Sequence, residues 1–310
     1  MKFRCSVLSV DEAVDFYSDG NLFDLLNKPS LLGDHIDFTV SDQPANSGYK
    51  IFYTNGYDNS VTYSRKQCHI NYPWEQMNNG ETLLYSTYPL LETQRQRNAC
   101  VTAYSAAVSL NNDGLLLLGK SGAGKTSVAV DLCRRYGAQL VGNDLTILGL
   151  QEDSLFVKGG TKFFLLRFES IRKSLPDLIS LFPNQAQESW LYKIKVEPEK
   201  LRIITRSHPV KIKRVFSLHV DEGLSSLHVQ NDQNLATKLF LIENFSRYIK
   251  GSCVNILGGE KFNQLNFVPS YDTEIFFNFR RSLIDIIESK IKYISGPLNL
   301  VTDYIANNNS

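Results

Sequence analysis

The segment from Gly119 to Thr126 carries the residues whose types and spacing most clearly indicate chemistry. It reads GKSGAGKT and fits the pattern G-x-x-x-x-G-K-[S/T] through Gly119, Gly124, Lys125 and Thr126. Glycines let a chain curl so tightly that several backbone N–H groups point at one polyphosphate. The lysine can reach the outer phosphates, and the hydroxyl can bind Mg²⁺. The spacing therefore predicts a loop that binds ATP, or a related nucleoside triphosphate, together with Mg²⁺.

The elements on either side of this loop are those that such a loop requires. Leu115 to Leu118 is a purely aliphatic run, which is typical of a buried strand. Thr126 to Tyr136 has apolar residues at helical spacing, and Gly137 follows as a helix-ending residue. The free N–H groups at the start of that helix add to the positive potential at the phosphates. The residues expected to contact the nucleotide are Gly119, Lys120, Ser121, Gly122, Ala123, Gly124, Lys125, Thr126 and Ser127.

A phosphate loop of this kind needs an acidic residue for the metal, and the sequence offers two candidates. Asp144 ends the strand that follows the loop helix, and we expect it to bind Mg²⁺ together with Thr126. Asp221 and Glu222 follow the apolar stretch Val215 to Val220. Because Gly223 comes next, the second pair is more typical of a turn.

The stretch LLLLGKSGAGKTSVAVDLCRRYGAQLVGNDLTIL resembles the catalytic segment of the HPr kinase/phosphorylase family, whose core is shared with phosphoenolpyruvate carboxykinase. In that family an apolar strand leads into G-x-S-G-x-G-K-[S/T], and a later strand ends on Asp-Asp. The resemblance covers about Cys100 to Leu150. The matching residues are Gly119, Ser121, Gly122, Gly124, Lys125, Thr126, Gly137, Leu140, Val141 and Asp144. It implies an ATP- and Mg²⁺-dependent kinase that phosphorylates a hydroxyl of a small molecule, peptide or protein.

The sequence departs from the family at Asn143, which stands where the first aspartate acts as general base. An amide cannot take a proton, so we expect Asn143 to position the acceptor while Asp144 and Lys125 bind metal and phosphates. Asn143→Asp should then supply a base. Arg167 follows an apolar stretch and could neutralise the transferring phosphoryl group. A solvated arginine at a strand end is the equally weighted alternative.

The same residues are also compatible with two other functions. A nucleotide-binding regulatory or assembly protein without phosphoryl transfer is favoured by Asn143. A carboxykinase-like or phosphorylase enzyme would need further metal ligands and a set of carboxylate-binding arginines, which we cannot identify in the sequence.

Composition limits the class of protein. The 310 residues are 43% hydrophobic and 21% charged, which suits a globular core. A net charge of +1 disfavours nucleic acid as the main partner. No apolar run approaches the roughly 18 residues of a membrane span. The five cysteines show no disulfide or zinc spacing, which predicts a cytoplasmic protein with reduced thiols. Self-association is left open.

The pattern of elements predicts an α/β fold with a mixed sheet. We expect a strand-rich region at 1–98, an HPr-kinase-like P-loop domain at 99–304 and a disordered tail at 305–310. Helices are predicted at Val10–Tyr17, Glu169–Ser174, Asp232–Lys250 and Asp272–Tyr293, and strands at Gln139–Val141, Leu145–Leu150, Leu155–Lys158, Trp190–Val196, Val215–Val220 and Leu265–Val268.

Overall fold

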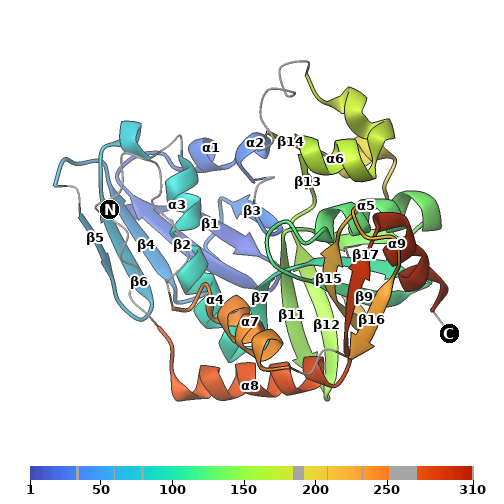
Figure 1. The fold of residues 1–310 in the computed structure, drawn as a ribbon. Coiled ribbons are helices and arrows are strands. Elements are labelled where there is room, and N and C mark those ends of the chain that lie inside the picture. The colour runs from blue at the N-terminus through green and yellow to red at the C-terminus, as the bar shows by residue number, and fades with distance from the viewer. Residues whose placement is uncertain are drawn as a thin grey trace. The chain divides into compact units, whose positions relative to one another are not determined.

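The computed structural model describes residues 1–32, 35–58, 60–77, 80–183, 192–207, 209–231, 234–250 and 271–308. It divides the chain into two compact units. Unit 1 contains residues 1–102 and 242–281, and unit 2 contains residues 103–241 and 282–310. The segment 242–281 therefore groups with the N-terminal residues, whereas the sequence pattern places it in the P-loop domain. Figure 1 labels the elements of both units.

Unit 1 is built on a mixed six-stranded sheet with the order β3-β1-β2-β4-β6-β5. Its strands β2, β4 and β6 run parallel, and the other neighbouring pairs are antiparallel. Its elements are β1 (Lys2–Ser9), β2 (Glu12–Ser18), α1 (Phe23–Leu26), α2 (Pro29–Leu32), β3 (Phe38–Ser41), β4 (Lys50–Thr54), β5 (Ser60–Tyr63), β6 (Gln67–Asn71), η1 (Trp74–Gln76), α3 (Glu81–Tyr85) and α4 (Tyr88–Arg97).

The helix predicted at Val10–Tyr17 is wrong, because these residues form a turn and strand β2. Val10 has a left-handed φ of 59°, and Ser9 pairs with Glu12 across a tight hairpin turn. Nearly all residues of β2 are buried, so the alternation that would reveal a strand is hidden. Residues 81–97, which fall in the region expected to be rich in strands, form helices α3 and α4.

Helix α4 carries a buried charge network in unit 1 that the sequence did not indicate. The Arg95 side chain is fully buried, and its guanidinium donates to Thr102 Oγ1 at 2.8 Å and Ser9 Oγ at 2.5 Å. Its Nε lies 3.5 Å from Glu12 Oε2. Burial raises the pKa of the Glu12 carboxyl, and Arg95 opposes that shift. The network joins both strands of the first hairpin to α4, and so stabilises this unit.

Unit 2 contains most of a nine-stranded sheet with the order β10-β8-β9-β15-β12-β11-β7, which β17 and β16 extend beside β15. Strands β9, β15 and β17 run parallel. Its elements are β8 (Ala106–Leu110), β9 (Asp113–Leu118), α5 (Lys125–Tyr136), β10 (Gln139–Gly142), β11 (Leu145–Gln151), β12 (Ser154–Gly160), β13 (Phe164–Arg167), α6 (Phe168–Ser174), η3 (Pro176–Leu181), β14 (Lys193–Val196), η5 (Pro198–Leu201), β15 (Val210–Val220), β16 (His228–Asn231), β17 (Ile291–Gly296) and α9 (Leu298–Asn307). The unit boundary falls within β7 (Cys100–Tyr104), α7 (Leu235–Ser246) and α8 (Glu274–Glu288).

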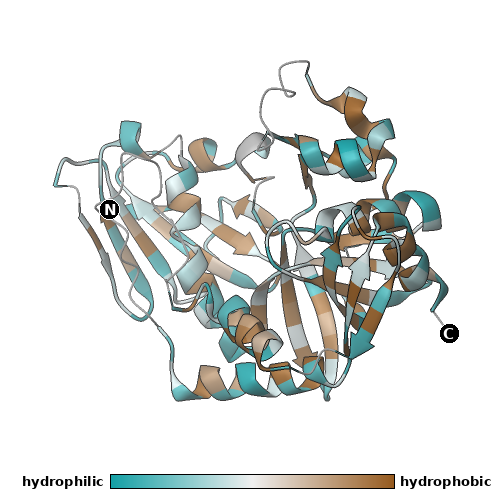
Figure 2. Cartoon of the chain, viewed as in Figure 1, coloured by the Kyte–Doolittle hydropathy of each residue, from teal (hydrophilic) through white to brown (hydrophobic). Residues whose placement is uncertain are grey.

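The core of unit 2 forms where α5 and α9 pack together against the sheet (Figure 1). Leu115 and Leu117 of β9 contribute to this core, as do Val128 and Leu132 of α5. Hydrophobic residues run along the strands in Figure 2, in keeping with their burial. Residues Leu115 to Leu118 of β9 are apolar and buried, as the sequence predicted.

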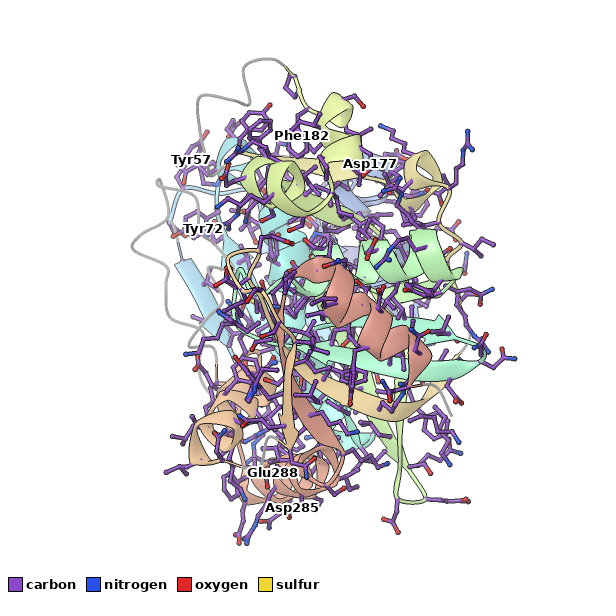
Figure 3. All side chains as sticks on the ribbon, turned by 45° about the vertical axis from the view of Figure 1, so that its right-hand side comes forward. Tyr57, Tyr72, Asp177, Phe182, Asp285 and Glu288 are labelled. Carbon is purple, nitrogen blue, oxygen red and sulfur yellow. The ribbon has the colours of Figure 1, made fainter. Side chains whose placement is uncertain are left out.

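The segment that follows β13 is joined to α5 by an ion pair and contains an aromatic contact of its own. Arg134 of α5 lies 2.5 Å from Asp177, and the Phe168 and Phe182 rings pack edge to face at 5.4 Å. Figure 3 labels Asp177 and Phe182 on this segment. β13 and β14 pair with each other, and together with α6 they carry part of the candidate site.

The C-terminal region differs from its prediction in two ways. The helix expected at Asp272–Tyr293 ends at Glu288, and the next residues form β17 because they pair with β15. The tail predicted at 305–310 is wrong up to residue 307, because α9 extends to Asn307 and buries Val301 and Ile305. The strand Leu265–Val268, the helix start Asp232 and the strand residues 190–191 lie outside the described residues.

The predicted fold class, a mixed α/β protein with mixed sheets, is confirmed. The predicted helix at 126–136 and the strands at 139–141, 145–150, 155–158 and 215–220 are also present. In the part of the chain that the structure describes, no helix combines the length and apolar character of a membrane span. The four described cysteines are Cys5, Cys68, Cys100 and Cys133, and all are buried free thiols.

Candidate phosphate-binding site

The glycine loop, residues 119–124, connects the end of β9 to the start of α5. Three of its glycines have left-handed φ angles: 144° at Gly119, 84° at Gly122 and 92° at Gly124. Residues with a side chain rarely adopt such angles. The glycine positions read from the sequence therefore coincide with the sharpest bends of the loop.

Gly119 and Gly124 are also required because the loop packs closely on β15. A Cβ at Gly119 would lie 3.0 Å from the Leu218 carbonyl oxygen, and one at Gly124 would lie 2.4 Å from Val220 Cγ2. The Val220 N–H donates to the Ala123 carbonyl at 3.1 Å, which ties the loop to the end of that strand. The loop is thus anchored by its own backbone and does not use the side chains at the start of α5 for this purpose.

Lys125 is the first residue of α5, and its side chain folds back over the loop. Its Nζ donates to the Gly119 carbonyl at 2.8 Å and to the Lys120 carbonyl at 3.1 Å. The ammonium also lies 4.0 Å from the centre of the Tyr104 ring, within range of a cation–π interaction. Only 6% of the residue is exposed. Lys125 is therefore held in place before any phosphate arrives.

Burial lowers the pKa of Lys125 to about 8, and the nearby Asp144 carboxylate opposes the shift. Desolvation disfavours the charged ammonium because the two carbonyls and the ring replace only part of its hydration. A polyphosphate beside the ammonium would favour the charged form and raise this pKa again. The site therefore holds a cation that gains from an anionic ligand.

Asn143 lies in the turn after β10 and is 1% exposed. Its Nδ2 donates to the Phe163 carbonyl at 3.1 Å, and its Oδ1 accepts from the Thr126 hydroxyl at 3.1 Å. A carbonyl can only accept, so the Phe163 contact fixes the orientation of the amide. Asn143 thus joins the first turn of α5 to the chain before β13 and directs the Thr126 hydroxyl.

The close approach of two glycines positions the Asn143–Asp144 turn beside the glycine loop. Gly142 and Gly160 approach so closely that a Cβ on Gly142 would lie 2.8 Å from the Gly160 Cα. This contact sets the end of β10 against the end of β12, and the Asn143 N–H donates to the Thr161 carbonyl at 2.9 Å. Asp144 has a left-handed φ of 67°, which aspartate and asparagine tolerate better than most residues.

The candidate site is the pocket that these elements enclose. It brings together the four residues that the sequence suggested for catalysis, Lys125, Asn143, Asp144 and Arg167. Residues 121–127 of the loop and of α5 also line it. Gly119 and Lys120, which the sequence also assigns to nucleotide contact, line a different pocket.

The residues present fit an Mg²⁺ ion bound jointly with phosphate. Thr126 and Asp144 line the same pocket, and Asp144 is the one carboxylate among the described residues that line it. Mg²⁺ typically takes one or two protein oxygens and completes its shell with phosphates and water. In the described residues, no three His, Cys, Asp or Glu side chains gather as a complete metal cluster.

The second acidic candidate, Asp221–Glu222, makes local structural contacts outside this pocket. Asp221 Oδ1 accepts from the Gly223 N–H at 2.8 Å, as in a side-chain-stabilised turn. Glu222 Oε1 accepts from the Leu298 N–H at 3.2 Å, at the start of α9. Both carboxylates therefore stabilise the turn after β15 and the start of the last helix.

Tyr104, Ser170 and Lys193 also line the pocket, and sequence reasoning missed all three as site residues. Lys193 lies within the strand predicted at Trp190–Val196, and Tyr104 lies in β7. No spacing relative to the glycine motif marks them, because β13, β14 and α6 reach the pocket through tertiary packing.

Comparisons with known proteins add little to this geometry. No family model matches the sequence, and no curated protein matches it. One solved structure that matches is the Hpr(Ser) kinase/phosphatase from Coxiella burnetii, at 16% sequence identity. The match covers 43% of this chain and 78% of that one, with a TM-score of 0.25. At that score the match decides neither the fold nor the function of this chain.

Proposed function

We propose that the protein is an ATP- and Mg²⁺-dependent phosphotransferase with an HPr-kinase-like P-loop domain. Its acceptor would be a hydroxyl of a small molecule, peptide or protein. The observation that carries the proposal is the convergence of Lys125, Thr126, Asp144 and Arg167 on one pocket beside a glycine loop. These residues come from three separate segments of the sequence, and each would have a chemical role in phosphoryl transfer.

The proposed roles follow from the contacts of each side chain. The Lys125 ammonium, held by two carbonyls, would turn its remaining N–H toward the phosphates. The loop and the first turn of α5 would donate backbone N–H groups to the same oxygens. Thr126 and Asp144 would hold Mg²⁺, which supplies charge neutralisation when bound. Arg167, which lines the same pocket from the end of β13, would neutralise the transferring group.

Asn143 is best assigned to positioning Thr126. Both polar atoms of its side chain already have partners, Thr126 and the Phe163 carbonyl. To hold an acceptor hydroxyl as well, its Oδ1 would have to accept a second hydrogen bond, which an amide oxygen can do. Catalysis would then depend mainly on positioning and charge neutralisation, as is general for loose phosphoryl-transfer transition states.

A protein that binds nucleotide without transferring phosphate is the second candidate. It is favoured by the shortage of bases: Asp144 is the sole carboxylate among the described lining residues, and the metal would occupy it. A missing general base costs on the order of 10²–10⁴-fold in rate. A slow reaction would suit a sensor that responds to bound nucleotide, because the nucleotide would then stay intact in the pocket.

Incubation with γ-labelled ATP and Mg²⁺ in a cell extract, followed by separation of products, tests the proposal. Label in an acceptor that depends on the intact protein supports phosphotransfer. Binding with neither transfer nor phosphate release supports the second candidate. No ATP binding at millimolar nucleotide contradicts both. The Lys125→Ala variant is the control, because any labelling that survives it comes from another enzyme.

A further inference from the structure

A second pocket lies on the β15 side of the glycine loop. Gly119 and Lys120 form part of its wall, together with residues from β15, β16, β17 and the first turns of α7. It shares Ala123 with the candidate site, whereas Lys125, Asn143 and Asp144 line only the other pocket. The two pockets therefore border the same loop but present different side chains.

Three hydrogen-bonding side chains form a row across the sheet in this pocket. Ser217 of β15 pairs with Tyr293 of β17, and Tyr293 pairs with Gln230 of β16. Paired residues on neighbouring strands point to the same face at a spacing of roughly 5 Å. All three line the pocket, so the row offers two hydroxyls and the amide of Gln230, whose Oε1 lies 3.4 Å from His228 Nε2.

The ionisable groups that can carry charge near neutral pH in this lining are basic. Lys120 carries an ammonium, and His219 shares the sheet face of Ser217 because it lies two residues further along β15. An imidazole donates an N–H in either protonation state and is cationic when protonated. None of the described lining residues carries a carboxylate. Lys120 and His219 are both exposed and can reach a ligand.

Apolar groups complete the pocket and limit the size of what it accepts. Phe240 and Ala236 of α7 line it on one side, and Tyr293 presents a half-buried ring. The Asn234 side chain already accepts the Thr237 N–H at 2.9 Å, which leaves its carboxamide partly engaged. A ligand that uses these surfaces needs a compact organic body as well as a negative group.

We propose that this second pocket binds a small organic anion through Lys120, His219 and the Ser217–Tyr293–Gln230 row. The anionic group would be a carboxylate or a phosphate ester, and the organic body would contact Phe240 and Tyr293. The site is separate from the candidate nucleotide site, so the proposal does not depend on the proposed function.

Occupancy of this pocket would also affect Lys125 through the loop. The carbonyls of Gly119 and Lys120 hold the Lys125 ammonium, and the same two residues form the wall of the second pocket. An anion that moves Lys120 would change how firmly these carbonyls hold the ammonium. Linkage requires that a nucleotide in the first pocket changes the affinity of the anion by the same factor.

The test follows the His219 ring signals by NMR in protein with ¹³C-labelled histidine, assigned by their loss in His219→Gln. Benzoate and phenylphosphonate are the probes, because each joins one anionic group to a compact ring. Benzamide is the uncharged match for benzoate. We expect one or both anions to shift the His219 signals saturably and benzamide to leave them unchanged. The anion that binds more tightly identifies carboxylate or phosphate as the natural group.

Two lysine variants separate a specific site from general attraction to positive charge. Lys120→Ala should weaken anion binding by up to about fivefold, as loss of one exposed charge contact can do. Lys213→Ala is the matched control, because Lys213 is exposed on the same strand β15 but lines neither pocket. The His219 shift should persist in Lys125→Ala, which separates this pocket from the nucleotide site.

The proposal is overturned if neither anion shifts His219 at about 10 mM, a concentration well above the Kd of a functional small-ligand site. It is equally overturned if benzamide acts like benzoate, or if Lys213→Ala weakens binding as much as Lys120→Ala. None of these results bears on triphosphate binding, which is measured separately on the wild-type protein.

Discussion

On one side of the glycine loop lie Lys125, Thr126 and Asp144; on the other lie Lys120, His219 and the turn at Asp221. The two lysines are separated by only a few residues, yet Lys125 is buried and held by two carbonyls, whereas Lys120 is exposed. Each side also has an acidic residue just after a strand of the same sheet. The two sides therefore look alike in sequence and differ in the structure.

The difference lies in what each side chain already contacts. Asp221 accepts from the Gly223 N–H and holds its own turn, so its carboxylate is committed. Asp144 lines the pocket, and its carboxylate favours the charged form of Lys125 and so raises the pKa of that ammonium. The carboxylate of Asp221 thus serves its own turn, whereas Asp144 lines the pocket together with Lys125 and Thr126.

The largest difference in ATP affinity should be that between variants of the two lysines. Lys125→Ala should reduce affinity for Mg²⁺·ATP on the order of a hundredfold, because it removes charge-assisted hydrogen bonds to phosphate. Lys120→Ala should reduce it by less than about fivefold, since this side chain is exposed on the other side. Isothermal titration calorimetry measures both, and circular dichroism melts check that each variant folds. Equal losses in the two variants would contradict the assignment of sides.

The next largest effect should distinguish the two acidic residues. Asp144→Asn should lower Mg²⁺-dependent turnover on the order of a hundredfold, because an amide binds the cation more weakly than a carboxylate. Asparagine tolerates the left-handed backbone at 144, so the fold should persist. Asp221→Asn keeps the oxygen that accepts from Gly223 and should stay within about twofold of wild type. The opposite ranking would move the metal site across the loop.

A smaller effect is expected on the stability of Asn143 variants. In Asn143→Asp a carboxylate oxygen would face the Phe163 carbonyl, where Nδ2 now donates at 3.1 Å. Losing a buried donor costs about 1–3 kcal/mol. Protonation restores a donor, so the introduced acid has a raised pKa in the folded state and the penalty grows as the pH rises. Urea unfolding at pH 5 and pH 7 measures it.

Asn143→Ala is the control for that experiment, because it loses both hydrogen bonds without adding a titratable group. Its cost should be the same at both pH values. If the new carboxylate of Asn143→Asp acts as a base toward water, ATP hydrolysis should rise, but only in the fraction of molecules that stay folded. If Asn143→Asp proved as stable as wild type at pH 7, the Phe163 contact would not define the role of this residue.

The smallest effect concerns pH. Burial lowers the pKa of Lys125 to about 8 in the free protein, so its ammonium loses its proton as the pH rises through that value. Because polyphosphate binds the ammonium form, affinity should be constant below pH 8 and fall above it, by up to about tenfold per pH unit. Lys125→Arg should remove this dependence, since arginine stays charged throughout. A flat profile in wild type would contradict the lowered pKa of Lys125 in the free protein.

Much of unit 2 could be predicted from local sequence, and less of unit 1. The strand, loop and helix from Leu115 to Gly137 have strong apolar periodicity and glycines at the bends, so neighbouring residues decide their structure. In unit 1, β2 is buried so completely that no alternation marks it. Arg95 is fully buried although arginine usually signals a surface, because its partners Ser9, Glu12 and Thr102 come from other elements.

The sequence by itself determined the glycine loop, its lysine and threonine, and Asp144 at the end of the following strand, because short-range spacing dictates how a strand enters a helix. Only the tertiary structure decided which distant residues meet there. Arg167, Lys193 and Tyr104 reach the pocket because β13, β14 and β7 are placed by contacts between segments far apart in the chain. Such contacts depend on the packing of whole elements, and no local pattern of residues encodes them.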